Sequence, residues 1–245
     1  MRRLTDGSRP VLAIGAALAI AGCPTQGPML TVGQPHTIIV QRDGDAQPTV
    51  QVGIPVLATG ASSLVLQRDG ATVATIANIA AASPSAWLPG GIDVWDLGAT
   101  YAPSLDYRIV ATSGGATVAQ DVPVSIFRSL TAFPQITSPV DGSRQQGSEP
   151  TILWTPVGVP EANPASGYRL DAWYVDNPSI PEQSYLLGPD EDRFDWGHPA
   201  TSSTGQELVP AQLTAGLPVE IQVVAIATSS FETDENVSRP VTFVP

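Results

Sequence analysis

The stretch Thr151-Ile152-Leu153-Trp154-Thr155-Pro156 places Ile152 and Trp154 on one side of an extended chain. Side chains alternate between the two faces of a strand, so this spacing predicts a β-strand with one apolar face. A longer run repeats the pattern, with apolar side chains at Val219, Ile221, Val223 and Ala225. No long stretch keeps the 3.6-residue period of an amphipathic helix. With 22 glycines, 24 prolines and 14% charged residues, the sequence predicts many turns and an all-β fold.

The residues around this stretch resemble fibronectin type III modules. Residues 151–156 are similar to the second strand of these modules, in which a buried tryptophan precedes Thr-Pro, and residues 167–175 resemble the strand that follows. Leu213-Thr214-Ala215-Gly216 resembles their Leu-x-x-Gly loop. Val219 stands where the family usually has a tyrosine, which removes the corner hydrogen bond of that tyrosine. The resemblance implies a fibronectin type III-like β-sandwich over residues 132–245.

The earlier part of the chain, residues 29–129, predicts another sandwich in tandem with the first. Two passages, 38–44 and 64–70, each lead β-forming residues into Asp-Gly, the pair that favours a type I′ hairpin turn. Ser113-Gly114-Gly115 marks a further tight hairpin. This spacing of strands and turns is typical of an immunoglobulin-like sandwich, here without the cysteine pair of antibody domains.

The N-terminal residues have the order of a bacterial export signal. Three arginines precede residues 11–22, an uncharged and mostly apolar stretch that ends in small residues. This stretch is too short to cross a bilayer, which takes about 20 apolar residues. Ile20-Ala21-Gly22-Cys23 resembles the lipobox of bacterial lipoproteins. The resemblance implies that residues 1–22 are removed as a signal peptide and that Cys23 carries lipid.

Lipid on Cys23 would anchor the chain to its membrane without a spanning helix, because two or three acyl chains bind a bilayer durably. Residues 23–28 then form a short lipidated tether. Pro24 follows the cysteine, in place of the aspartate that retains many lipoproteins at the inner membrane, so we expect an outer-membrane lipoprotein on the periplasmic or surface face. The alternative is an ordinary cleaved signal that leaves Cys23 as a free thiol.

The charge of the chain argues against nucleic acid as a partner. Removal of residues 1–22 lowers the basic residues from 11 to 8 and the acidic residues from 23 to 22, so the mature net charge is −14. Phosphate backbones repel such a chain. Cys23 is the only cysteine, so no disulfide within the chain can form and the sandwiches depend on apolar packing.

The sequence contains few of the residue patterns that enzymes use for catalysis. There are two histidines, and the spacings of a zinc site, a nucleophile elbow and a dinucleotide fingerprint are all missing. Asp195, His198 and Ser202 hold the parts of a hydrolytic triad, but residues packed into one loop rarely reach triad geometry. We therefore predict no catalytic residues, no cofactor and no enzyme activity, with a hydrolase that has an unrecognised site as an alternative.

Two acidic passages are weak candidates for calcium, because hard oxygen ligands in loops can bind this ion. The first contains Asp190, Asp192 and Asp195, and the second covers residues 232–236. Neither has EF-hand spacing, so solvated acidic loops are the preferred interpretation.

Aromatic side chains are the candidate ligand-binding residues. Trp173 lies on the face of its strand opposite to the apolar face, and Trp196 lies in the region of the first acidic passage. Exposed aromatic rings can stack on sugars or anchor a protein partner, although rings that cover the sandwich ends are the preferred interpretation. Together these features predict a membrane-anchored lipoprotein that acts as a non-catalytic binding or structural module of the cell envelope. An accessory carbohydrate-binding surface protein is an alternative.

Overall fold

The computed structural model describes residues 27–158, 166–177, 182–198, 200–201, 207–208, 210 and 212–245. The predicted signal peptide and Cys23 lie outside the described residues. Within the described ranges the chain is all-β, as predicted from its composition, with a single 3₁₀ turn, η1 (Ile79–Ala81). No helix among these residues is long and apolar enough to cross a membrane.

The N-terminal sandwich consists of two sheets with a core between them. One sheet contains β1 (Met29–Val32), β2 (His36–Arg42), β3 (Thr49–Thr59) and β6 (Ile92–Thr100). The other has the order β5-β4-β7-β8, with β4 (Ser63–Arg68), β5 (Ala71–Ile76), β7 (Ser104–Ser113) and β8 (Ala116–Ser125). Alternate residues such as Ile54, Leu66 and Ile109 are fully buried between the sheets.

The C-terminal sandwich packs a larger sheet against a smaller one. The larger contains β10 (Ser143–Arg144), β12 (Gly167–Tyr174), β13 (Gln183–Leu187), β17 (Val219–Thr228), β18 (Glu232–Val237) and β19 (Val241–Val244). The smaller has the order β14-β11-β9, with β9 (Gln135–Ser138), β11 (Thr151–Thr155) and β14 (Arg193–Asp195). A short hairpin, β15 (Ala200–Thr201) with β16 (Glu207–Leu208), completes the described strands.

Trp154 is at the centre of the second core. Its side chain is 3% exposed, and its ring lies 5.6 Å from that of Tyr168 between ring centroids. Ile152 on the same face of β11 is fully buried, whereas Leu153 on the opposite face is 37% exposed. The predicted one-sided strand is confirmed.

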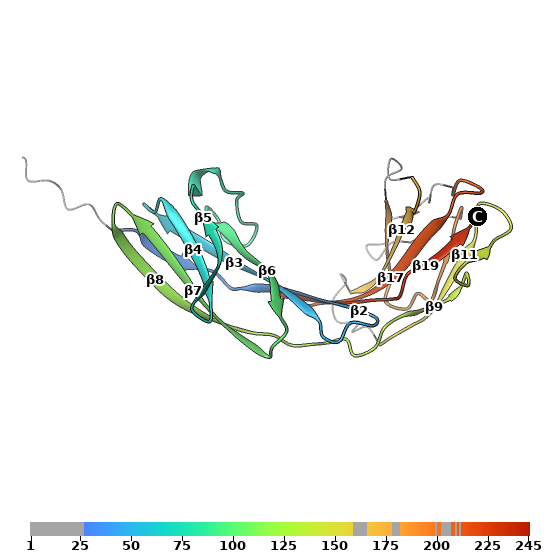
Figure 1. The fold of residues 1–245 in the computed structure, drawn as a ribbon, viewed down its shortest axis with the longest axis horizontal. Coiled ribbons are helices and arrows are strands. Elements are labelled where there is room, and N and C mark those ends of the chain that lie inside the picture. Colours follow the sequence, from blue (N-terminus) through green and yellow to red (C-terminus); the bar gives the residue numbers. More distant parts are fainter. Residues whose placement is uncertain are drawn as a thin grey trace, which may run out of the picture.

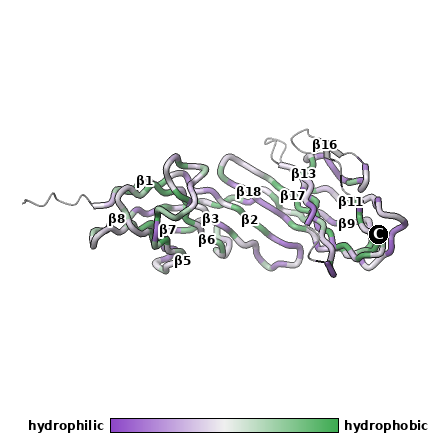
Figure 2. Tube along the Cα trace, turned by 90° about the horizontal axis from the view of Figure 1, so that it is seen from above, coloured by the Kyte–Doolittle hydropathy of each residue, from purple (hydrophilic) through white to green (hydrophobic). Residues whose placement is uncertain are grey.

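The two sandwiches share one sheet. β2 pairs with β18 in parallel, from Thr37 opposite Glu232 to Arg42 opposite Val237. The β2-containing sheet of the N-terminal sandwich and the larger sheet of the C-terminal sandwich therefore form a single ten-stranded sheet. Figure 2 shows β2 and β18 side by side between the two sandwiches. In Figure 1 the sandwiches are the two arms of a bent molecule, and residues 127–132 run along its convex side.

The two Asp-Gly pairs have different conformations. Asp69 and Gly70 both have positive φ, 51° and 81°, as a type I′ turn between β4 and β5 requires, and this prediction is confirmed. At the first pair only Gly44 has positive φ, so the predicted type I′ turn is wrong there. Asp43 instead extends the contact between β2 and β18, because its N–H donates to the Val237 carbonyl at 2.9 Å.

A tyrosine supports the Leu-x-x-Gly loop although Val219 replaces the usual one. The N–H of Thr214 donates to the Tyr174 hydroxyl at 2.7 Å, so the end of β12 holds this loop. Val219 itself is buried in the core at the start of β17.

Candidate functional site

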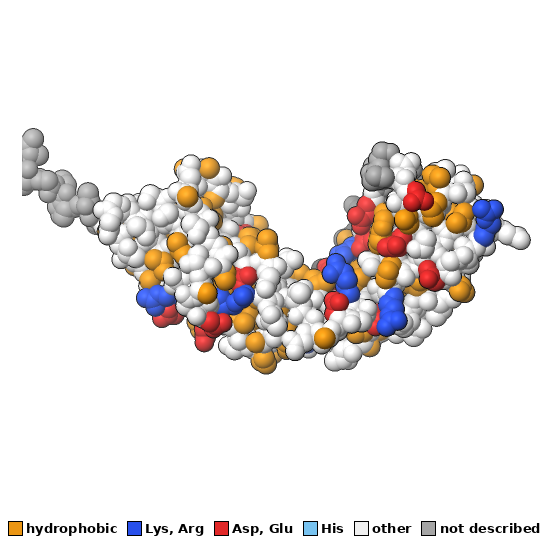
Figure 3. Space-filling view, viewed as in Figure 1, with side chains coloured by type: hydrophobic (Ala, Val, Ile, Leu, Met, Phe, Trp, Pro, Cys, Tyr) orange, Lys and Arg blue, Asp and Glu red, His pale blue; other side chains and the backbone are white. Residues whose placement is uncertain are grey.

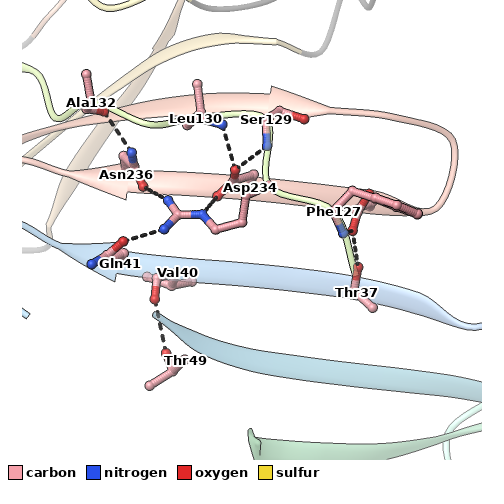
Figure 4. Close-up of polar contacts among 12 residues, drawn as sticks. Thr37, Val40, Gln41, Thr49, Phe127, Ser129, Leu130, Ala132, Asp234 and Asn236 are labelled. Atoms are coloured by element: carbon pink, nitrogen blue, oxygen red, sulfur yellow. Dashed lines mark hydrogen bonds and ion pairs between the residues drawn. The ribbon is translucent and has the colours of Figure 1, made fainter. Parts of the chain in front are cut away.

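The junction between the sandwiches is fastened by polar side chains on one face of β18 (Figure 4). Asp234 has a 1% exposed carboxylate, and its Oδ2 accepts hydrogen bonds from the backbone N–H groups of Ser129 and Leu130 at 2.7 and 2.8 Å. Glu232 accepts one from the Phe127 N–H at 2.7 Å. These acceptors bind the connecting residues 127–132 along β18.

Arg128 lies between the two paired strands. It donates to the Gln41 side chain of β2 and, at 2.6 Å, to Oδ1 of Asn236 in β18, while its Nε lies 3.5 Å from Asp234 Oδ1. Asn236 in turn donates to the Ala132 carbonyl at 2.7 Å. One guanidinium therefore links both sandwiches and the residues that connect them.

This arrangement corrects the expectation for residues 232–236. They form strand β18 and not an acidic loop, and the side chains of Asp234 and Asn236 are buried against the connecting residues. Side chains alternate between the two faces of a strand, so Glu232, Asp234 and Asn236 share one face and all point towards the connecting residues.

The opposite face of the shared sheet carries a groove of about 710 Å³ that contains residues of both sandwiches. Val40 and Arg42 contribute from β2, with Val224 and Val237 from the neighbouring strands of the C-terminal sandwich. We call this side the concave face, since the connecting residues lie on the convex side (Figure 1). Figure 3 shows the hollow between the arms, with acidic and basic side chains gathered on the arm of the C-terminal sandwich.

The groove is charged with both signs. Arg169 donates through Nε to both carboxylate oxygens of Asp171, at 3.1 and 2.9 Å, and through Nη1 to Glu235 at 3.1 Å. Asp171 also accepts from the Ser184 hydroxyl at 2.5 Å. This network crosses from β12 to β18 and holds their outward side chains in fixed positions.

The two tryptophans predicted as ligand-binding residues lie in different environments. Trp173 is half-buried and lines the groove. Trp196 is fully buried, in edge-on contact with Phe194 at 5.3 Å and Tyr185 at 5.7 Å between ring centroids. Trp196 therefore does not offer the exposed ring that its candidate role in ligand binding requires, because pairing of β14 with β11 directs this ring into the core.

An aromatic pocket, formed by His36, Trp87, Trp95 and Phe231 beside the β17–β18 turn, lies on the same face of β2 as Val40 and Arg42. The His36 ring stacks on Trp87 at 5.1 Å and meets Trp95 edge-on at 4.7 Å, and Trp87 lies 6.0 Å from Phe231. Sequence reasoning missed this pocket, because it joins two strands and two loops whose contacts no local motif specifies.

His36 is buried as a neutral group. Burial lowers the pKa of its imidazole, and the nearby Asp93 carboxylate only partly opposes this effect. Both ring nitrogens are buried without a hydrogen-bond partner among the described residues.

Because the pKa of His36 is lower in the folded protein than in the unfolded chain, only the unfolded chain takes up this proton just below pH 6.5. Stability is therefore expected to fall as the pH drops from about 6.5 towards the folded pKa, and to be independent of His36 above that range. Urea unfolding of the unmodified protein and of His36→Phe, at about pH 5 and about pH 7.5, measures this. The variant should lose less stability on acidification, whereas exposed His198→Gln should keep the original dependence. Identical pH dependence in all three proteins would exclude the effect.

The remaining site candidates are not brought together. Asp190 and Asp192 are exposed, and Asp195 is bound bidentately by Arg193 at 2.7 and 2.8 Å, which lowers the pKa of Asp195. Among the described residues, no group of three or more histidine, cysteine or acidic side chains could hold a metal ion. Ser202 of the triad considered above lies outside the described residues.

Comparison with known proteins gives similarity of fold alone. No protein-family model matches the chain, and no curated protein matches it. Similar solved structures include the titin domains Z1Z2 in complex with telethonin, with 14% identity, 91% of this chain and 98% of that chain covered, and a TM-score of 0.26. They also include the chicken CNTN1 FN1–FN3 domains, with 13% identity, coverage of 86% and 68%, and a TM-score of 0.38. Sidekick-1 immunoglobulin domains 1–5 match with 13% identity, coverage of 89% and 39%, and a TM-score of 0.26.

Proposed function

We propose that the chain is a non-catalytic binding module of the bacterial cell envelope, anchored by lipid on Cys23, that engages a protein partner through the groove of the concave face. The observation that carries this proposal is the parallel pairing of β2 with β18. It builds one groove from two sandwiches and fixes the distance between the side chains on its two sides.

The composition of the groove supports a protein partner. Val40, Val224 and Val237 line the groove, with Val40 the least buried of the three, and Arg169 and Glu235 present paired charges at its side. Apolar area with satisfied polar groups around it is the usual make-up of a protein–protein contact. The carbohydrate alternative loses one of its two stacking residues, because Trp196 is buried in the core.

The lipobox resemblance of residues 20–23 supports the anchor. The first described strand begins at Met29, six residues after the expected lipid on Cys23. A module attached in this way would stay at the membrane while its sandwiches contact other envelope proteins.

In-cell photo-crosslinking tests both parts of the proposal. A benzophenone amino acid replaces Trp173 in the groove or, as a control, Val140, which is 69% exposed and outside the groove. We expect a discrete protein adduct from position 173 alone, and membrane-bound, acylated protein unless Cys23→Ser is also present. Equal adducts from both positions would contradict the groove as the binding site. Unchanged acylation and fractionation of Cys23→Ser would contradict the anchor.

A further inference from the structure

The aromatic pocket has a volume of about 280 Å³ and is open to solvent on one side. Trp87 is 50% exposed and Phe231 is 44% exposed, so two of its rings retain free surface. Large aromatic side chains gain about 1.5–3 kcal/mol when they are buried, so their exposure at the mouth of a pocket is a feature that a ligand would explain.

The loop that carries Trp87 is fixed in place. The Ser85 hydroxyl accepts hydrogen bonds from the N–H groups of Trp87 and Leu88 at 3.1 and 3.2 Å, and donates to Asp93 at 2.6 Å. The Ser85 N–H donates to the Gly91 carbonyl at 2.8 Å. Because these bonds hold the loop before any ligand arrives, binding does not have to order it.

The electrostatics of the pocket favour a cation. No arginine in the described part of the chain lines it, and His36 beneath Trp87 is neutral at pH 7 because burial lowers its pKa. The Asp93 carboxylate acts electrostatically on the His36 ring, and its hydrogen-bond donor is neutral, the Ser85 hydroxyl. Aromatic faces and this carboxylate together attract positive charge.

We propose that the aromatic pocket binds a quaternary ammonium group, as found in choline and betaine. A primary ammonium carries three N–H donors that must each find an acceptor, whereas the pocket is lined mainly by apolar surface. A methylated ammonium has no N–H donors and spreads its charge over methyl groups, so it loses less hydration on entering such a site. Trp87 and Phe231 supply the ring faces that contact these methyl groups. The proposal is independent of the groove and of the anchor.

Calorimetric titration of the full chain bearing Cys23→Ser with choline chloride, at constant ionic strength, tests this site. We expect saturable binding that Trp87→Ala weakens by about tenfold, which corresponds to the contribution of one cation–π contact of about 1.4 kcal/mol. The matched control is Phe127→Ala, which removes a 68% exposed ring outside the pocket and should leave binding unchanged. The neutral tert-butyl analogue of choline, with carbon in place of nitrogen, should bind far more weakly.

Several results would overturn the proposal: no saturable binding of choline or betaine, equal binding of the neutral analogue, equal losses in Trp87→Ala and Phe127→Ala, or binding of a methyl glycoside in place of choline. Vesicles distinguish the sources of the ligand. Retention on phosphatidylcholine but not phosphatidylglycerol vesicles, reversed by free choline, identifies a lipid headgroup. Binding of free choline without vesicle retention identifies a soluble ligand.

Discussion

Replacing Trp154 with alanine is expected to lower the free energy of unfolding by about 3–5 kcal/mol, the usual cost of removing a large aromatic side chain from a core. The side chain is 3% exposed on the central strand of the β14-β11-β9 sheet and packs on Tyr168. Alanine leaves a cavity that strands on both sides hold open. Chemical denaturation, followed by the fluorescence of the remaining tryptophans, measures the change.

Two matched variants test whether the loss of stability in Trp154→Ala comes from the packed core. Leu153→Ala changes the opposite, 37% exposed face of β11 and should cost much less. Trp154→Phe keeps an aromatic ring and removes the indole N–H, which is buried without a hydrogen-bond partner among the described residues, so its cost should also be smaller. Equal effects of Trp154→Ala and Leu153→Ala would show that Trp154 is not part of a packed core.

Asp234→Ala is expected to destabilise the protein by about 3 kcal/mol, because it removes one partner of a buried ion pair. The substitution leaves the Arg128 guanidinium without its carboxylate and the Ser129 and Leu130 N–H groups without their acceptor. Denaturation should also become less cooperative as the two sandwiches separate. The control is Asp121→Ala, which breaks the exposed pair with Arg108 and should cost less than about 1 kcal/mol. Equal losses of stability in Asp234→Ala and Asp121→Ala would show that the contacts of Asp234 at the junction do not stabilise the protein more than an exposed ion pair does.

Local pattern predicted strands and tight hairpins of this fold but not the pairing of strands that are distant in the sequence. The period-two spacing of Ile152 and Trp154 identified a buried face because that spacing depends on one strand alone. The Asp69-Gly70 turn was predicted for a similar reason, since positive φ at two successive residues is a local requirement. The type I′ turn predicted at Asp43-Gly44 was wrong, because the Val237 carbonyl of a distant strand binds the Asp43 N–H.

Long-range pairing also explains the errors at the candidate sites. Residues 232–236 look like a solvated loop because all five of their side chains are polar, yet the partners of Asp234 are backbone groups of the connecting residues. Trp196 follows an acidic passage, and only the pairing of β14 with β11 places it in the core. The lipid on Cys23 remains a prediction, since this residue lies outside the described ranges.

Measuring the distance between the two sandwiches is the most direct test of the claim that the shared sheet holds them as one rigid body. Cys23→Ser removes the only cysteine, so nitroxide labels can be placed through Gln120→Cys and Val140→Cys, at exposed positions in the two sandwiches. Double electron–electron resonance should give one narrow distance distribution, which broadens when Asp234→Ala is added. A broad distribution in the protein with Asp234 intact would contradict the fixed junction and the single groove that depends on it.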